Sequence, residues 1–220
     1  MLAIPFQIQI LNLSKSFHQQ SIFKDLSFNL YPSHRLAVTG PNGSGKSTFL
    51  KVFVGKMQSD SGNVSLIKGK KSVSSDFFYK YIAWDAPYIE IYPYFSVKET
   101  FYWHFQFFTP ILSLKEWLNV LQLEDFQNKE LKYLSSGTLQ RVKVGLALFS
   151  QTPILVLDEP TANMDTGNAN KMIELIYTYS QNRILVIASN LLREVERTDQ
   201  QLVCSFHSGS LVFHLYTKIG

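Results

Sequence analysis

The stretch GPNGSGKST, residues 40–48, decides how the rest of this 220-residue chain is interpreted. It fits the pattern G-x-x-x-x-G-K-[ST] from Gly40 to Ser47, between an apolar run (RLAVT) and a helix-like run (TFLKVFVG). Glycines let successive backbone N–H groups curl around an anion, and the start of a helix adds partial positive charge. A plain glycine-rich turn is the alternative, but it would not require the lysine, the serine and all the glycines of this pattern between a strand and a helix. The stretch therefore predicts a phosphate-binding loop for ATP or GTP.

The side chains of this loop have separate expected roles. Lys46 would reach the β- and γ-phosphates, and Ser47 would place its hydroxyl on Mg²⁺. The remaining positions are expected to line the bound nucleotide: Gly40, Pro41, Asn42, Gly43, Ser44, Gly45 and Thr48.

A second chemical signal is the run ILVLDEP, residues 154–160. Its aliphatic part predicts a buried strand, and ligands of open α/β sheets bind at the carboxyl ends of such strands. Asp158 is suited to hold Mg²⁺ through Ser47 or water, and Glu159 to polarise the water that attacks the γ-phosphate. The alternative is a helix-capping pair of carboxylates after a turn made by Pro160.

Composition limits the class of protein. With 45% hydrophobic and 17% charged residues, the chain can bury a substantial core as one large domain or two small ones. No apolar run is long enough to span a bilayer and no leader is evident, so we expect a cytosolic chain. Cys204, the single cysteine, excludes an internal disulfide and is expected to be a buried filler. A net charge of +4 with scattered basic residues does not predict nucleic-acid binding.

Strand-like runs come in two styles along the chain. The early runs (FQIQILNL, IFKDLSFNL, HRLAVTG) and the last two, around Ser208-Gly209, are typical of antiparallel strands. The runs at 154–158 and 184–189 are continuously aliphatic, which is typical of buried parallel strands. From 85 to 150 helical patterns dominate. The sequence predicts an α/β fold with a mixed or parallel core sheet, an antiparallel β flap and a helical insert.

The stretch LSSGT, residues 134–138, followed by LQRV, extends these motifs into a resemblance. Its place before the acidic strand end is similar to that of the signature LSGGQ in the nucleotide-binding subunits of ABC transporters, and the resemblance covers nearly the whole chain. Ser135 and Gly137 match this signature, whereas Ser136 replaces a glycine and Thr138 a glutamine. A Ser- and Gly-rich helix start is a second anion site, which the family presents to the γ-phosphate held by another subunit.

The resemblance carries further expectations. It implies one ABC-type P-loop ATPase domain over 1–220, with 1–84 and 151–220 as core and flap and 85–150 as the helical subdomain. Asp165, in ANMD, would lie at the dimer interface. Phe17 would stack on adenine, with core packing as an equally weighted alternative. The expected cofactors are ATP and Mg²⁺, and the expected partners are a second ABC subunit, in a homodimer or pseudo-symmetric dimer, and a separate permease at the cytoplasmic face of a membrane.

Two positions depart from the family pattern. Pro87 stands where the family has a glutamine that touches Mg²⁺ and water, and it has no amide to offer. Asp85 is a candidate to reach Mg²⁺ through water, although DAPY is equally interpretable as a simple turn. Asn190 stands where the family has a histidine at the γ-phosphate. It can donate a hydrogen bond but cannot shuttle a proton, and it can instead cap a helix in LLREVER.

An aromatic-rich stretch and the two departures shape the functional prediction. Ten aromatic side chains lie between Tyr88 and Phe108, of which we expect about two thirds in the core and the rest in a partner groove. The leading hypothesis is a transporter ATPase with slow but real turnover that rests on Glu159, Lys46 and Asn190. The alternatives are a nucleotide-binding regulator with little turnover and a soluble ABC ATPase that acts on nucleic acid or ribosomes.

Overall fold

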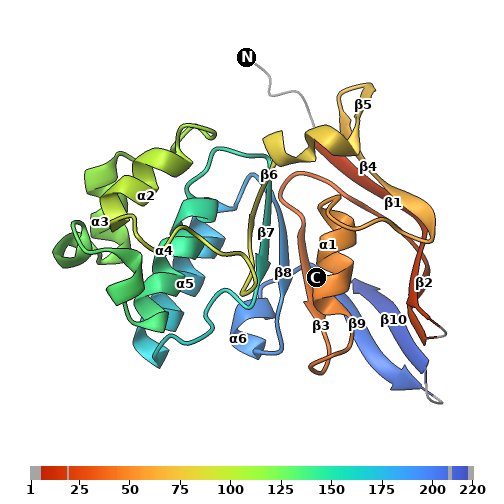
Figure 1. The fold of residues 1–220 in the computed structure, drawn as a ribbon. Helices are drawn as coiled ribbons and strands as arrows, with labels where there is room; N and C mark the ends of the chain where they lie inside the picture. Colours follow the sequence, from red (N-terminus) through yellow and green to blue (C-terminus); the bar gives the residue numbers. More distant parts are fainter. Residues whose placement is uncertain (1–5, 19, 208–209, 218–220) are drawn as a thin grey trace.

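A computed structural model describes residues 6–18, 20–207 and 210–217 and shows two sheets with helices packed around them (Figure 1). The larger sheet has six strands in the order β10-β9-β3-β8-β7-β6. Their bounds are β3 (Arg35–Thr39), β6 (Ile82–Asp85), β7 (Ile154–Asp158), β8 (Ile184–Ala188), β9 (Gln200–His207) and β10 (Ser210–Thr217). β9, β3, β8, β7 and β6 are parallel, and β10 pairs antiparallel with β9. The mixed α/β core is therefore confirmed.

The two continuous aliphatic runs form the inner strands β7 and β8 of this sheet. Every residue of β7 and β8 is buried, because helices or the second sheet cover both faces. The antiparallel prediction for HRLAVTG is wrong, since β3 lies between β8 and β9 and is parallel to both. Its three central residues, Leu36–Val38, are fully buried. A run of five residues is too short for its hydrophobic pattern to distinguish an antiparallel strand from a buried parallel one.

The smaller sheet is antiparallel, in the order β2-β1-β4-β5, and confirms the predicted flap. Its strands are β1 (Phe6–Phe17), β2 (Gln20–Leu30), β4 (Ser61–Lys68) and β5 (Lys71–Val73). The helix α1 (Lys46–Phe53) lies between this sheet and the larger one (Figure 1), and its apolar face enters their shared core. The predicted turn at Ser208-Gly209 lies outside the described residues.

Helices dominate the segment between β6 and β7, as predicted. They are α2 (Val97–His104), α3 (Leu114–Leu121) and α4 (Ser136–Leu148), with short 3-10 turns at η2 (Glu124–Phe126) and η3 (Leu131–Tyr133); a further 3-10 turn, η1 (Ser75–Lys80), precedes β6. Serines with a glutamate three residues later start α2 and α3 as capping boxes. α4, together with α5 (Thr166–Tyr179), packs on the face of the sheet opposite α1. α6 (Leu192–Val195) is a single turn after β8.

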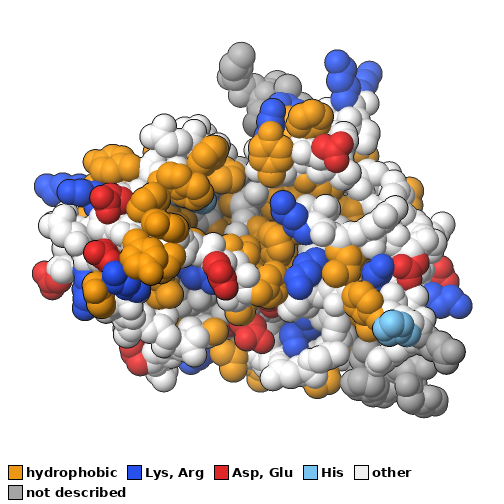
Figure 2. Space-filling model, viewed as in Figure 1, with side chains coloured by type: hydrophobic (Ala, Val, Ile, Leu, Met, Phe, Trp, Pro, Cys, Tyr) orange, Lys and Arg blue, Asp and Glu red, His pale blue; other side chains and the backbone are white. Residues whose placement is uncertain are grey.

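The prediction that most aromatics of 88–108 lie in the core is wrong. Of the ten, only Phe101 is buried, and Phe95, Phe105 and Phe108 are half-buried. The other six are exposed: Tyr88, Tyr92, Tyr94, Tyr102, Trp103 and Phe107. An eight-residue helix turns a single narrow face to the core, so α2 leaves its other rings in solvent. Figure 2 shows hydrophobic side chains gathered at the left of the molecule, where Figure 1 places α2 and α3.

Two further observations concern the cysteine and the helices. Cys204 is free and buried, as expected of a filler residue. Within the described ranges, no helix combines the length and the apolar composition of a membrane span.

Candidate functional site

The phosphate loop connects the end of β3 to the start of α1, as the sequence predicts. Gly40, Gly43 and Gly45 have φ values of 144°, 78° and 90°, which L side chains rarely adopt. A Cβ on Gly45 would come within 2.2 Å of Ile22 Cγ2, so a larger residue there would push β2 away. The loop is therefore fixed by glycine conformation and by close packing against the flap.

Polar groups inside the loop form a cradle for an anion. The ammonium of Lys46, which is 5% exposed, donates to the carbonyl oxygens of Gly40 at 2.7 Å and Pro41 at 3.1 Å. Ser44 is buried, and its Oγ has no hydrogen-bond partner among the described residues. A buried hydroxyl without a partner is costly unless a ligand uses it. These observations fit a nucleotide phosphate, the group that the sequence predicts.

The acidic strand end lies against this loop. The Oγ of Ser47 donates to Asp158 Oδ2 at 2.7 Å, although the two residues are far apart in sequence. Burial raises the pKa of Asp158, an effect that the bond from Ser47 opposes and the charge of Glu159 reinforces. A hydroxyl and a carboxylate are hard oxygen ligands, so this pair fits Mg²⁺. The metal itself stays a prediction.

Glu159 follows Asp158 in a strained conformation. Its φ is 50°, in the left-handed region that is costly for a non-glycine residue, and its N–H donates to the carbonyl of Ala188 at 2.8 Å. The side chain is half-buried. The capping alternative is wrong, because the next helix, α5, begins at Thr166 and has Asp165 as its N-cap. Backbone strain of this kind is concentrated at functional sites, which is consistent with the predicted role of Glu159.

Asn190 lies across the phosphate loop at the end of β8. Its Oδ1 accepts from the Gly40 N–H at 3.3 Å, and its Nδ2 donates to Asn42 Oδ1 at 3.1 Å. The capping alternative is wrong here also, because the N-cap of α6 is Leu191. The amide is therefore beside the loop that would hold the phosphates, and its contact with a γ-phosphate stays a prediction.

The side chain of Asp85 faces α4 instead of the phosphate loop. Asp85 is 3% exposed, with Gln140 Nε2 at 3.1 Å from one carboxylate oxygen and Lys143 Nζ at 3.6 Å from the other. Gln140 also approaches the Pro160 carbonyl at 3.5 Å, which links α4 to the acidic strand end. Since both oxygens have partners on α4, the structure does not support the expected metal contact of Asp85.

This buried carboxyl predicts an effect of pH on stability. Burial raises the pKa of Asp85 from 3.8 to about 6, against the opposing charge of Lys143. The folded state therefore holds an extra proton between about pH 4 and pH 6, and this contribution to stability is lost as the pH rises through 6. We expect Asp85→Asn to remove up to about 3 kcal/mol of that decline. Urea unfolding between pH 4 and pH 7 measures it, with the exposed Asp125→Asn as control, and identical pH slopes in Asp85→Asn and the unaltered protein would contradict the prediction.

The signature-like loop starts α4. Ser135 is the N-cap, and its Oγ accepts from the Thr138 N–H at 3.2 Å while Ser135 and Ser136 remain exposed. A Cβ on Gly137 would lie 2.6 Å from the Asn163 carbonyl, so this glycine allows the loop to pack on the segment after β7. The exposed hydroxyls at the helix start are compatible with the predicted anion site, which stays a prediction.

Two further predicted residues lie on the surface. Phe17, at the end of β1, is 44% exposed, so the core alternative is wrong, and Lys15 Nζ lies 5.4 Å from its ring centroid. An exposed ring is compatible with adenine stacking, which stays a prediction. Asp165 is exposed and accepts from the Asn168 N–H at 3.0 Å as the N-cap of α5, so it has a structural role besides the predicted one at a dimer interface.

The sequence analysis missed Tyr88. Its ring lies 4.2 Å from the ammonium of Lys51 on α1, and burial, followed by the negative charge of Asp158, raises the pKa of its hydroxyl. Only its place beside Pro87, where the family pattern breaks, pointed to this position. No spacing rule in the sequence predicts that a residue after β6 contacts Lys51 on α1.

The chain is similar to known proteins. The sequence profile of the family described as ABC transporter matches residues 23–162, more than half of the chain. The chain is 30% identical over 179 residues to the cytochrome c biogenesis ATP-binding export protein CcmA of Brucella abortus (strain 2308), which covers 81% of this chain and 82% of that protein. It is 28% identical over 195 residues to the lantibiotic transport ATP-binding protein SrtF of Streptococcus pyogenes, over 86% and 82%.

Solved structures agree in fold. A dimeric ATP-binding cassette in a post-hydrolysis state, bound to ADP and Pi, superposes with a TM-score of 0.78 at 20% identity, over 97% of this chain and 99% of that one. The residues matched by the profile include the phosphate loop and the acidic strand end described above. The chain belongs to the ABC transporter family, as an ATP-binding and ATP-hydrolysing subunit.

Proposed function

We propose that this ATPase subunit works as one half of a dimer that closes around nucleotide and drives a separate transmembrane permease. The observation that carries the proposal is the phosphate cradle of residues 40–48, with its buried, unpartnered Ser44 hydroxyl and its bond from Ser47 to Asp158. In the dimer, each phosphate loop faces Ser135, Ser136, Gly137 and Thr138 of the other subunit. The pair is a homodimer or a pseudo-symmetric dimer of two ABC chains.

The side chains have distinct tasks in hydrolysis. Lys46 leaves the Gly40 and Pro41 carbonyls for the β- and γ-phosphates. Ser47 and Asp158 hold Mg²⁺, which neutralises phosphate charge when it is bound. Glu159 accepts a proton from the attacking water.

Asn190 has a smaller part in this scheme. Its Nδ2 leaves Asn42 and donates to the γ-phosphate. An amide cannot carry a proton away, so we propose slow turnover. A regulator with little turnover is the second candidate, favoured by Pro87 and Asn190, whereas the strained Glu159 favours hydrolysis.

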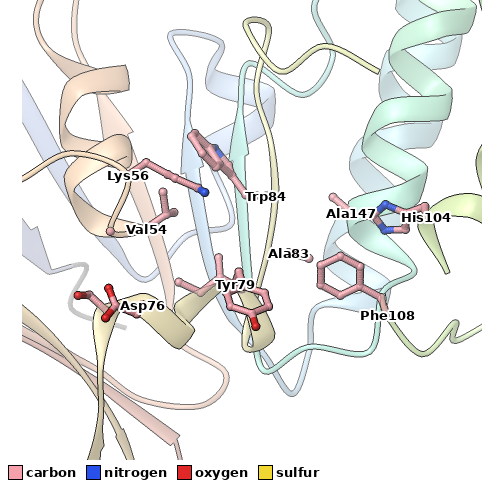
Figure 3. Close-up of a pocket in the computed structure, with 12 residues that line it drawn as sticks. Val54, Lys56, Asp76, Tyr79, Ala83, Trp84, His104, Phe108 and Ala147 are labelled. Atoms are coloured by element: carbon pink, nitrogen blue, oxygen red, sulfur yellow. The ribbon is translucent and has the colours of Figure 1, made fainter. Parts of the chain in front are cut away.

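The docking surface for the permease is proposed at a pocket of about 360 Å³ between the core and the helical segment (Figure 3). Val54 and Lys56 from the end of α1, Tyr79 from η1, Trp84 from β6 and Phe108 after α2 line it. The exposed aromatics of 88–108 continue the apolar surface, and aromatic rings are favoured at interfaces. We propose that the subunit lies on the cytoplasmic face of a membrane, with 85–150 as its helical subdomain.

ATP turnover with and without the permease tests this proposal. The permease to use is a polytopic membrane protein sought among the neighbouring reading frames, reconstituted with this chain in lipid vesicles. We expect the permease to stimulate turnover, and Tyr79→Glu to remove the stimulation without changing basal turnover. Tyr216→Glu, an equally exposed tyrosine on β10, is the control. Basal turnover no higher than that of Glu159→Gln would favour the regulator.

A further inference from the structure

We propose that Glu194 is a positioning residue for hydrolysis, because its buried carboxyl group holds the turn after β7 that begins with Glu159. The inference rests on the role proposed for Glu159 and adds a residue to that site. Glu194 lies on α6 and is 1% exposed. Burying a carboxyl group is costly unless its oxygens are hydrogen-bonded, so the partners of this group bear directly on its role.

Among the described residues, the Glu194 carboxyl group accepts hydrogen bonds from Thr161 alone. Its Oε1 accepts from the Thr161 N–H at 3.1 Å and also from the Thr161 hydroxyl. Its Oε2 is buried and has no partner in the described part of the chain. Thr161 is 2% exposed, so water does not compete for the two bonds. The carboxyl group therefore acts on the second residue after Glu159.

The segment that carries Asn190 holds this turn at two points. The Ala188 carbonyl, just before Asn190, accepts from the Glu159 N–H at 2.8 Å. Glu194, just after Asn190, accepts from Thr161. A left-handed φ of 50° at Glu159 persists only where the surrounding structure fixes it, and these two attachments do so. Glu159 is thereby held in place relative to Asn190.

The short helix α6 is itself attached to α5. The Tyr177 hydroxyl of α5 donates to the Glu194 carbonyl at 2.7 Å, and Tyr177 is 5% exposed. Val195, the next residue on α6, is buried in the same apolar cluster as Met172, Ile173 and Tyr177. A single helical turn is not stable in isolation, so this packing makes α6 a fixed support for the turn after β7.

Thr161→Val tests this role, because valine keeps the shape of the side chain and removes the hydroxyl that donates to Glu194. We expect kcat for ATP, measured by phosphate release without a permease, to fall about tenfold. KM for ATP should change by less than about twofold, because the phosphate cradle is unaltered. Thr161→Ser, which restores the hydroxyl, should keep at least about half of kcat.

Thr198→Val is the matched control. It makes the same change at an equally buried threonine near α6, whose hydroxyl donates to the Val195 carbonyl at 2.6 Å, and it should leave kcat unchanged. Combining Thr161→Val with Glu159→Gln shows whether the effect passes through Glu159. In that background, Thr161→Val should lower the residual turnover by less than about twofold.

Amide hydrogen exchange over 158–164, measured by mass spectrometry, reports on the same turn without turnover. It should be at least about threefold faster in Thr161→Val than in Thr161→Ser. Unchanged kcat in Thr161→Val, an equal fall in Thr161→Ser or Thr198→Val, or a full tenfold fall in the Glu159→Gln background would overturn the inference. If the unaltered protein had no turnover, the proposed function would fail, and only unchanged exchange in Thr161→Val would overturn the hold of Glu194 on the turn.

Discussion

Replacing Glu159 with Gln should lower ATP turnover by about 10²- to 10³-fold, because it removes the carboxylate expected to accept a proton from the attacking water. ATP binding should change by less than about threefold, since Gln has the same shape and the cradle of Lys46 and Ser44 is untouched. The strained backbone at this position, with its N–H on the Ala188 carbonyl, should persist in the variant. Phosphate release and titration with a fluorescent ATP analogue measure the two quantities.

Glu90→Gln is the matched control for that variant. It makes the same chemical change at an exposed position in the loop after β6, and it should leave turnover unchanged. If Glu159→Gln turned over ATP as fast as the unaltered protein, the water would not depend on this carboxylate. The hydrolytic role of the strand end would then be wrong, and a nucleotide-binding regulator would be favoured.

The parts of the molecule that the sequence predicted are those where local chemistry leaves few alternatives. The loop of residues 40–48 needs glycines at left-handed φ, and the structure has them. β7 and β8 contain continuous aliphatic runs, which are typical of strands buried on both faces. Helices were expected from 85 to 150, and the capping boxes at Ser96 and Ser113 explain where two of them begin.

The parts that the sequence did not predict depend on partners far along the chain. Asp85 faces Gln140 and Lys143 because α4 packs beside β6, a contact between residues more than fifty positions apart. The ring of Tyr88 lies against Lys51 of α1 for the same reason, because the strand that precedes it packs beside the helix of the phosphate loop. The prediction that most aromatic rings of 88–108 lie in the core rests on their hydrophobicity alone. The sequence does not show how little of the surface of α2 faces the core. Tertiary packing, which no local pattern encodes, decided all three.

Lys46→Ala and Gly137→Asp should each abolish turnover, for different reasons. The first removes the ammonium that the cradle offers to phosphate. The second adds a carboxylate at the start of α4, where a Cβ in place of the glycine hydrogen would lie 2.6 Å from the Asn163 carbonyl. We expect each variant alone to lose at least about 100-fold in turnover, since both sites of either homodimer are damaged.

Mixing these two variants should restore activity, provided that each site is shared between subunits. In a mixed dimer, one site combines the intact loop of the Gly137→Asp subunit with the intact signature-like loop of the Lys46→Ala subunit. Random pairing would recover about a quarter of the original turnover, because half of the dimers are mixed and each has one good site. Lys46→Ala mixed with Glu159→Gln is the control, since both changes damage the face that holds the phosphates and no mixed site is complete. Recovery in that control, or none in the first mixture, would show that Ser135 to Thr138 do not complete the site of a second subunit.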